Sequence, residues 1–299
     1  MARLFGAYVV VTWTAAEGRK TGEQSLWIGV MKRDVRFRLA YEAHNPATRA
    51  EGEALLRAIL ADLARRGDRA LVAFDFPLGL PEGTSKRLEL GAWPALWSFM
   101  ASNVVDKPDN TNNRFAVAAK VNRLMTDEAR PFWGAPQRQT QRWMAGTKPA
   151  DGYGDVREFR RTERATQKLG KAAAKSVWQM QGAGSTGGQA LLGIAAAKRI
   201  IDGLGASAAV WPFGTGWRAL TPADVEPLSA LFVETYTPLF PAKPEPGEVK
   251  SATAVRGVAE ALAKLDEAGK LGAAFAPPKS ASEKDIAAVE HDEGWMFGA

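Results

Sequence analysis

The chain has 299 residues, of which 46% are hydrophobic and 24% charged, and its formal net charge is +6 with a pI of about 9.5. This length is sufficient for one large domain or two small ones. The chain has no cysteine and only two histidines, which excludes disulfides, thiolate metal sites, a cysteine nucleophile and a three-histidine zinc site.

The two histidines and the apolar segments narrow the class of protein further. His44 lies in a predicted loop and His291 in a charged tail, and both are interpreted as solvated surface groups. Catalysis would therefore use carboxylates, lysine, hydroxyls or an oxygen-ligated metal. No apolar stretch approaches the roughly 20 residues that span a bilayer. We expect a cytoplasmic protein without a membrane partner, whose basic charge suits nucleic acid or phosphorylated ligands.

The first 81 residues predict the beginning of a mixed α/β sheet. Short polar connections between the first three strands indicate an antiparallel meander. The helix that follows has Thr48 as N-cap, Glu51 at capping-box spacing and Gly67 as its stop. A helix before the fourth strand is the crossover that a parallel strand requires. The strands are predicted at 7–14, 25–31, 34–41 and 69–76, and the helix at 48–67.

The fourth predicted strand, RALVAFDF, is nearly all apolar, which indicates burial on both faces. It ends at Asp75, and a loop with Pro77, Gly79 and Pro81 follows. An acid at the carboxyl end of such a strand is a recurrent site position in open α/β sheets. Asp75 is therefore a candidate catalytic residue. The alternative is that its side chain caps the turn through hydrogen bonds to the backbone.

Residues 82–188 differ from the rest of the chain in being rich in Trp, Arg, Asn, Gln and Gly and weakly periodic. They predict a basic insertion or subdomain between two parts of the core, 1–81 and 189–299, with a basic helix at 156–175. Its tryptophans suit either a satellite core or base stacking. Beyond it, helices are predicted at 187–205 and 252–271, strands at 207–213 and 229–236, and an acidic tail at 279–299.

The segment 182–187, Gly-Ala-Gly-Ser-Thr-Gly, matches the G-x-G-x-x-G pattern of dinucleotide sites. That pattern should follow a strand, but a basic helix and KSVWQMQ precede it here, which disfavours a dinucleotide site. We favour a loop at a helix N-terminus, whose free N–H groups and dipole attract phosphate. The alternative is a turn whose glycines permit close packing. The candidate phosphate-binding residues are Gly182, Gly184, Ser185, Thr186 and Gln189, with Lys175 nearby.

The basic segment FRRTER is a second candidate for phosphate binding. In a functional interpretation, Arg160 and Arg164 hold phosphate oxygens through their guanidinium forks, with Glu163 between them. The alternative is a solvated helix face on which Glu163 pairs with a neighbouring side chain.

Several segments together resemble an uncharacterised bacterial family, domain of unknown function 429, which is placed among ribonuclease-H-like predicted nucleases. The resemblance covers most of the chain and is most specific in FDFPLGLP, QGAGSTGGQALLGI and VETYTPLF. It implies a ribonuclease-H-like mixed sheet with an antiparallel three-strand meander, a helix and parallel strands. In that superfamily, carboxylates from strand ends and a late helix hold two divalent cations that activate water against a phosphodiester. The resemblance therefore implies Mg or Mn, since both prefer oxygen ligands.

Two acids of this chain match the family's segments. Asp75 matches the acid of Asp-x-Pro-x-Gly, and Glu234 matches that of Glu-x-Tyr-Pro, although Thr237 stands where proline is expected. The resemblance thus implies that Asp75 and Glu234 are catalytic metal ligands. The alternative for Glu234 is a buried acid paired with an arginine of the basic helix.

The acidic site also departs from the family at two positions. The first strand reads Thr-Trp-Thr from Thr12 where the family has Asp-Trp-Ser, and a neutral hydroxyl is a weaker ligand than a carboxylate. Ser251 stands where an acid should open the last helix, and Glu260 and Asp266 lie deeper in that helix. The predicted metal site is therefore incomplete.

Three functions follow from these features. The first is a divalent-metal-dependent phosphodiesterase or nuclease, a hydrolase, with an incomplete acidic site. The second is a non-catalytic binder of nucleic acid, a nucleotide or a phosphorylated metabolite. The third is a cofactor-pathway enzyme that acts on a nucleotide-like substrate. Metal binding separates the first from the second, and salt dependence separates nucleic acid from a small ligand.

Overall fold

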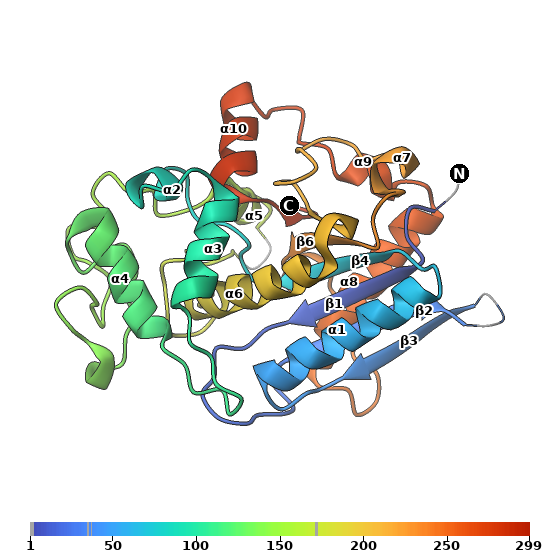
Figure 1. Ribbon diagram of the computed structural model, residues 1–299, viewed down its shortest axis with the longest axis horizontal. Coiled ribbons are helices and arrows are strands. Elements are labelled where there is room, and N and C mark those ends of the chain that lie inside the picture. The colour runs from blue at the N-terminus through green and yellow to red at the C-terminus, as the bar shows by residue number, and fades with distance from the viewer. Residues whose placement is uncertain (1–2, 35, 37, 171–172) are drawn as a thin grey trace.

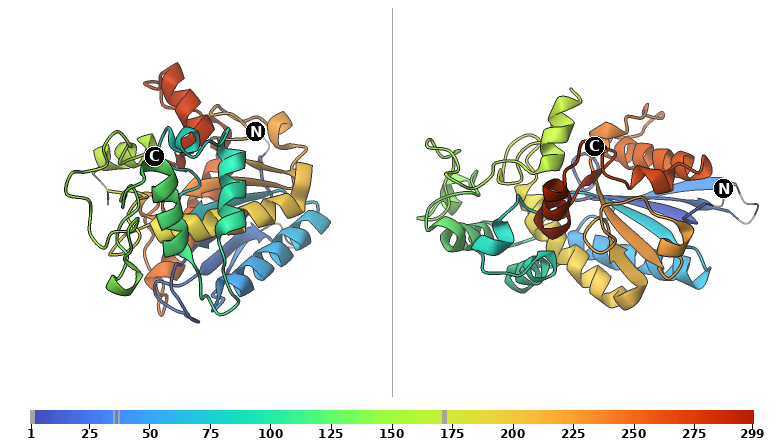
Figure 2. Two further views of the ribbon diagram at one scale, coloured as in Figure 1. Left: turned by 60° about the vertical axis from the view of Figure 1, so that its left-hand side comes forward. Right: turned by 90° about the horizontal axis from the view of Figure 1, so that it is seen from above.

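The computed structural model describes residues 3–34, 36, 38–170 and 173–299 as a mixed α/β fold built on a seven-strand sheet. The strand order is β3-β2-β1-β4-β6-β5, and β7 pairs with β6. Helix α8 covers one face of the sheet, and α1 and α6 cover the other (Figures 1 and 2). The strands are β1 (Ala7–Thr12), β2 (Trp27–Arg33), β3 (Leu39–His44), β4 (Ala70–Asp75), β5 (Ala208–Val210), β6 (Ala230–Thr235) and β7 (Met296–Phe297).

The helices connect and flank these strands. Helix α1 begins as predicted, because the Thr48 hydroxyl accepts a hydrogen bond from the Glu51 N–H. Among the described residues, no helix combines the length and the apolar character that a membrane crossing requires. The helices are α1 (Arg49–Arg65), α2 (Thr84–Arg87), α3 (Trp93–Asn103), α4 (Arg114–Thr126), α5 (Arg161–Lys168), α6 (Gly187–Leu204), α7 (Pro222–Val225), α8 (Lys250–Glu267), α9 (Leu271–Ala274) and α10 (Glu283–Ala288).

The pairing of the strands brings several sheet ends to one edge. β1 and β2, and β2 and β3, are antiparallel, as the predicted meander requires. β4 is parallel to β1 and to β6. The carboxyl ends of β1, β4 and β6 therefore lie together, and Thr12 is in register with Asp75.

Alternation along these strands divides the sheet into two buried faces. Val10, Ala73 and Val233 belong to the core beneath α8. Phe74 and Phe232 belong to the core beneath α1 and α6. The same alternation assigns the strand-end residues Thr12, Asp75 and Thr235 to the α8 face and Glu234 to the opposite face.

The segment predicted as an insertion extends away from one end of the sheet (Figure 1). It contains α2 to α5, of which only a basic helix was predicted, because its mixed composition hides helical periodicity. Leu96, Trp97 and Phe115 of this segment belong to the same buried core as Val9 and Phe74 of the sheet. Trp97 is fully buried, which fits the core interpretation of this tryptophan. The boundaries 82 and 188 remain a prediction.

Several predicted elements have different bounds in the structure; β5, for example, is Ala208–Val210 where 207–213 was predicted. The third strand begins at Leu39 rather than at 34, since the Asp34 carboxylate accepts from the N–H groups of Arg36 and Arg38 and forms a turn. Residues 35 and 37 of that prediction lie outside the described residues. The basic helix is confined to α5, and 171–172 of its predicted range also lie outside them. The predicted acidic tail contains α10 and β7, whose pairing with β6 was not predicted.

A substitution at Gly79 tests how closely the loop after β4 packs against the C-terminal segment. A methyl group at this position would lie 2.4 Å from the carbonyl oxygens of both Asp292 and Glu293. We expect Gly79→Ala to lower the free energy of unfolding by about 2 kcal/mol, because backbone atoms must move apart. Gly91→Ala is the matched control, as nothing lies within 4 Å of its added methyl group. Urea unfolding measures both, and equal stabilities would contradict the tight packing.

Candidate functional site

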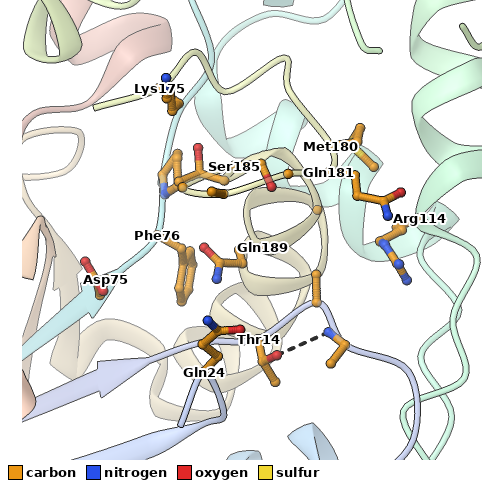
Figure 3. Close-up of a pocket in the computed structure, with 18 of the residues that line it drawn as sticks. Thr14, Gln24, Asp75, Phe76, Arg114, Lys175, Met180, Gln181, Ser185 and Gln189 are labelled. Atoms are coloured by element: carbon orange, nitrogen blue, oxygen red, sulfur yellow. Dashed lines mark hydrogen bonds between the residues drawn. The ribbon is translucent and has the colours of Figure 1, made fainter. Parts of the chain in front are cut away.

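A cleft of about 860 Å³ opens at the carboxyl ends of β1, β4 and β6. Its walls come from the loop after β1, the loop after β4, the start of α4 and the glycine-rich loop before α6. Figure 3 shows Asp75 and Arg114 at opposite sides of the cleft, with Phe76 and Gln189 between them. Neither His44 nor His291 is among the residues that line it. The edge of the sheet predicted to carry the site thus carries the cleft.

Asp75 lies in the cleft at the end of β4. Its carboxylate accepts hydrogen bonds from the N–H and the hydroxyl of Thr237, at 3.0 and 3.2 Å. Burial raises the pKa of Asp75 to about 6; the bonds from Thr237 oppose the rise and the charge of Glu234 adds to it. Asp75 therefore caps the turn after β6, not the loop after its own strand.

Glu234 is held by a buried arginine. Both of its carboxylate oxygens accept from the Arg160 guanidinium, at 2.6 and 2.7 Å, and one also accepts from the Leu78 N–H. Arg160 also donates to Glu163, and neither of these two side chains has exposed surface. The alternative interpretation of Glu234, a buried acid paired with an arginine, describes this arrangement.

This placement corrects the predicted phosphate-binding role of FRRTER. Arg160 and Glu163 lie inside the protein and cannot contact a ligand without unfolding their surroundings. Arg164 is exposed, but it lines a separate cavity of about 530 Å³ together with Trp217 and Trp295. The segment therefore connects β6 with the C-terminal segment through Arg160, and it does not line the cleft.

The residues at the predicted metal positions do not fit a two-metal centre. The Thr12 hydroxyl accepts from the Trp27 N–H, and the Ser251 hydroxyl accepts from the Gln24 N–H. Asp266 lies near the other end of α8 and accepts from two backbone N–H groups at the N-terminus. Within the described residues, no group of three or more His, Asp or Glu side chains is placed to hold a metal ion. We therefore derive no reaction step through a metal.

The glycine-rich loop, in contrast, lines the cleft, and it precedes a helix as predicted. Gly182 and Gly184 have positive φ angles, which shape the loop. Gly187 begins α6, and a methyl group there would lie 2.5 Å from the Val177 carbonyl oxygen, so the loop also needs glycine for packing. Gln189 donates to the Trp13 carbonyl and thereby ties α6 to the loop after β1. All five candidate phosphate-binding residues line the cleft: Gly182, Gly184, Ser185, Thr186 and Gln189.

Four basic side chains line the same cleft as this loop: Lys20, Arg114, Arg138 and Lys175. Of these, only Lys175 was singled out from the sequence. The signal for Arg114 was its place after the asparagine-rich run DNTNN, where a helix begins. Arg138 comes from a short turn in the insertion, and no local pattern distinguishes it.

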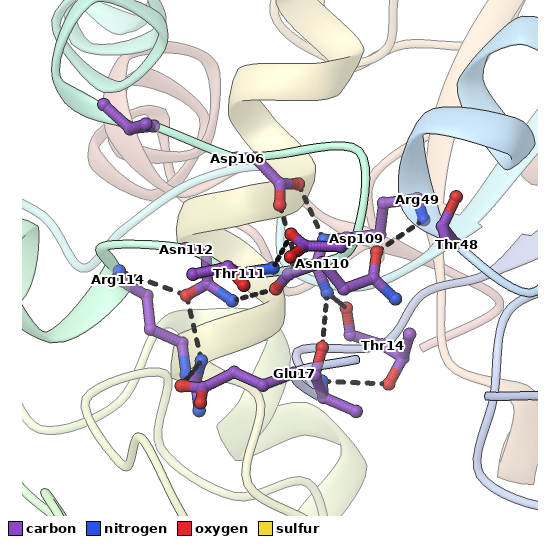
Figure 4. Close-up of polar contacts among 12 residues, drawn as sticks. Thr14, Glu17, Thr48, Arg49, Asp106, Asp109, Asn110, Thr111, Asn112 and Arg114 are labelled. Carbon is purple, nitrogen blue, oxygen red and sulfur yellow. Dashed lines mark hydrogen bonds and ion pairs between the residues drawn. The ribbon is translucent and has the colours of Figure 1, made fainter. Parts of the chain in front are cut away.

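A buried network holds the loop after β1 in place (Figure 4). The Arg49 guanidinium donates to both oxygens of Asp106, at 2.6 and 2.7 Å, and to the carbonyl oxygens of Thr14 and Ala16. Asn110 accepts from the Arg49 N–H. Arg49 therefore positions the residues that lead into Glu17 at the cleft wall.

Comparisons with protein-family models, with curated proteins and with solved structures give no match.

The raised pKa of Asp75 predicts a pH-dependent stability. A carboxyl group whose pKa rises on folding contributes its full stabilisation below the unfolded pKa, near 3.8, and loses it as the pH rises through about 6. Asp75→Asn should therefore be more stable than wild type by on the order of 2 kcal/mol at pH 8, with the gain vanishing near pH 4. Urea unfolding between these pH values measures this.

Asp202→Asn is the control for that experiment, because Asp202 pairs with Lys198 on the surface of α6. We expect it to follow the wild type at each pH. Equal stability of Asp75→Asn and wild type at pH 8 would contradict a raised pKa at Asp75.

Proposed function

We propose that the protein binds a phosphorylated small molecule in the cleft, with a phosphate group at the first turn of α6. The observation that carries this proposal is a set of unused hydrogen-bond donors. In the part of the chain that the structure describes, the N–H groups of Gly188 and Gln189 have no hydrogen-bond partner. No acidic residue lies in this turn. Such a turn attracts an anion through its N–H groups and the helix dipole.

Unpaired polar groups that line the cleft support the same ligand. The hydroxyl groups of Thr186 and Thr235, both lining the cleft, have no hydrogen-bond partner among the described residues. Thr235 is only 2% exposed, and an unpaired buried hydroxyl is costly. The stem of Lys175 lies beside Gly184, 3.6 Å from where a methyl group would stand, and its ammonium has no ion pair within the described residues. A phosphate at the α6 turn would supply acceptors to Thr186, the N-cap of this helix, and to Lys175.

The dimensions of the cleft favour a small molecule over nucleic acid. Its volume of about 860 Å³ falls within the range of about 300–1,000 Å³ typical of small-molecule sites. A ribonuclease-H-like fold stays part of the proposal: the meander, the crossover helix and the parallel β4 are consistent with it, and no comparison tests it. A nucleotide or another phosphorylated metabolite suits the cleft.

Asp75 extends the proposal from binding to catalysis. A carboxyl group with a pKa near 6 can give up or take a proton near neutral pH. It lies in the same cleft as the proposed phosphate site. An enzyme acting on a nucleotide-like substrate would use Asp75 as its acid or base.

Lys175→Gln tests the proposed phosphate site. Calorimetry with inorganic phosphate should show about tenfold weaker binding than to wild type, since one charged donor is lost. Lys168→Gln is the charge-matched control, because Lys168 lines the separate cavity near Trp217. Its affinity should remain within twofold of wild type. Equal losses in both variants, or no phosphate binding by wild type, would contradict the site.

The salt dependence of binding separates a small ligand from nucleic acid. A single phosphate site predicts a shallow decrease in affinity with salt, whereas 6–10 phosphate contacts lower affinity by about 10³–10⁵ between 50 and 200 mM salt. A steep slope with a long oligonucleotide would favour nucleic acid instead.

The metal-dependent phosphodiesterase is a second candidate, favoured by Asp75 at the end of β4 in register with Thr12. Strands in register lie about 4.8 Å apart, so Thr12→Asp would set two carboxylates side by side. If the site is a decayed metal centre, Thr12→Asp should bind Mn²⁺ at least tenfold more tightly than Thr12→Asn, its neutral control. Equal Mn²⁺ affinities in calorimetry would count against this candidate.

A further inference from the structure

Arg114 lies directly beside the proposed phosphate site. A methyl group on Gly188, in the first turn of α6, would lie 3.2 Å from Cδ and 3.5 Å from Nε of Arg114. The guanidinium of Arg114 also stacks over the Phe115 ring at 4.5 Å. Its side chain is 13% exposed, so its position is set by its neighbours. A ligand group bound next to the α6 turn would therefore meet Arg114.

Glu17 holds Arg114 and Arg138 through loose contacts. It lies 3.2 Å from Arg114 and 3.5 Å from Arg138, each through a single nitrogen. The buried pair of Arg49 with Asp106, by comparison, has two hydrogen bonds of 2.6 and 2.7 Å. The Glu17 side chain is 39% exposed and can turn into water at little cost in hydration. Its contacts are therefore exchangeable.

The Arg114 guanidinium has hydrogen-bond donors that no described residue uses. Its Nη1 serves both Glu17 and Asn112, and its Nε has no partner within the described residues. Burial lowers the pKa of Arg114, as do the charges of Arg49 and Arg138, and Glu17 only partly compensates. The guanidinium is thus short of negative charge.

We propose that the ligand carries a diphosphate group, whose second phosphoryl group binds Arg114 and Arg138 in place of Glu17. This rests on the proposed function, in which the first phosphoryl group lies at the α6 turn. The contact between Arg114 and Gly188 puts the two positions next to each other, as adjacent phosphates of one diphosphate require. In the unliganded protein, Glu17 then occupies the place of the ligand. When Glu17 leaves, only hydrogen bonds and ion pairs are exchanged and no covalent bond changes.

The test compares inorganic phosphate with inorganic pyrophosphate by calorimetry in metal-free buffer. Wild type should bind pyrophosphate about tenfold more tightly than phosphate, because two charged sites are used. Glu17→Gln should tighten pyrophosphate binding about fivefold and phosphate binding less than twofold. Glu42→Gln is the charge-matched control, as Glu42 pairs with Lys32 on the sheet and does not line the cleft.

Arg138→Ala provides a second variant that keeps the fold, since Arg138 is 75% exposed. It should weaken pyrophosphate binding about fivefold, a larger loss than for phosphate, which is proposed to bind first at the α6 turn. If wild type binds phosphate at the α6 turn but Glu17→Gln matches Glu42→Gln for both probes, the diphosphate proposal is overturned and the proposed function stands. If neither wild type nor Glu17→Gln binds either probe, both are overturned.

Discussion

The hydrogen bonds and ion pairs of the Arg160 guanidinium are the interaction on which the rest of the structure depends. It has no exposed surface and joins Glu234 at the end of β6, Glu163 on α5 and the backbone carbonyl of Glu293 near the C-terminus. Taking these charges out of water is costly, and removing one partner of such a cluster costs about 3–5 kcal/mol. The cluster therefore fixes where three distant segments of the chain lie.

That constraint decides which acid remains open to the cleft. The Glu293 carboxylate accepts from the backbone of Glu82 and of Arg161, and Asp292 accepts from the N–H groups of Gly83 and Ser85. The C-terminal segment is thus fastened to the start of the inserted region, and Glu234 is enclosed between them. Asp75, whose strand position faces α8, accepts hydrogen bonds from Thr237 alone among the residues that the structure describes. Both acids of this sheet edge line the cleft, but Glu234 is held in a buried ion pair with Arg160, whereas Asp75 is partly exposed.

The sequence predicts the parts of this arrangement that depend on neighbouring residues. Thr48 and its helix, the buried strand ending at Asp75 and the glycine-rich loop at the start of α6 all follow from local patterns, and the structure has each of them. The first strands and their antiparallel order follow from short connections. These features are visible because chain periodicity and capping act within a few residues.

What could not be predicted depends on contacts between distant residues. The role of Arg160 requires Glu234, 74 positions away, and the pairing of β7 with β6 requires the chain's end to return to the sheet. The register that sends Asp75 and Glu234 to opposite faces is set by β4 and β6 together, not by either segment alone. Likewise, Arg114 meets Glu17, 97 positions away, on a loop that Arg49 holds through the carbonyl oxygens of Thr14 and Ala16. Alternation shows which side chains share a face only once the register is known.

The charges of the cleft make its two ends interdependent. Asp75 ionises with difficulty because it is buried and near Glu234, and a bound phosphate would add a further negative charge to the same cleft. Since like charges disfavour ionisation, the anion and the proton on Asp75 stabilise each other. By linkage, the factor by which a bound anion raises the proton affinity of Asp75 equals the factor by which protonation of Asp75 raises the affinity for the anion. The basic groups beside α6 oppose this effect. With a pKa of about 6, Asp75 is mostly ionised at neutral pH, so an anion bound as proposed would shift its protonation toward neutral pH.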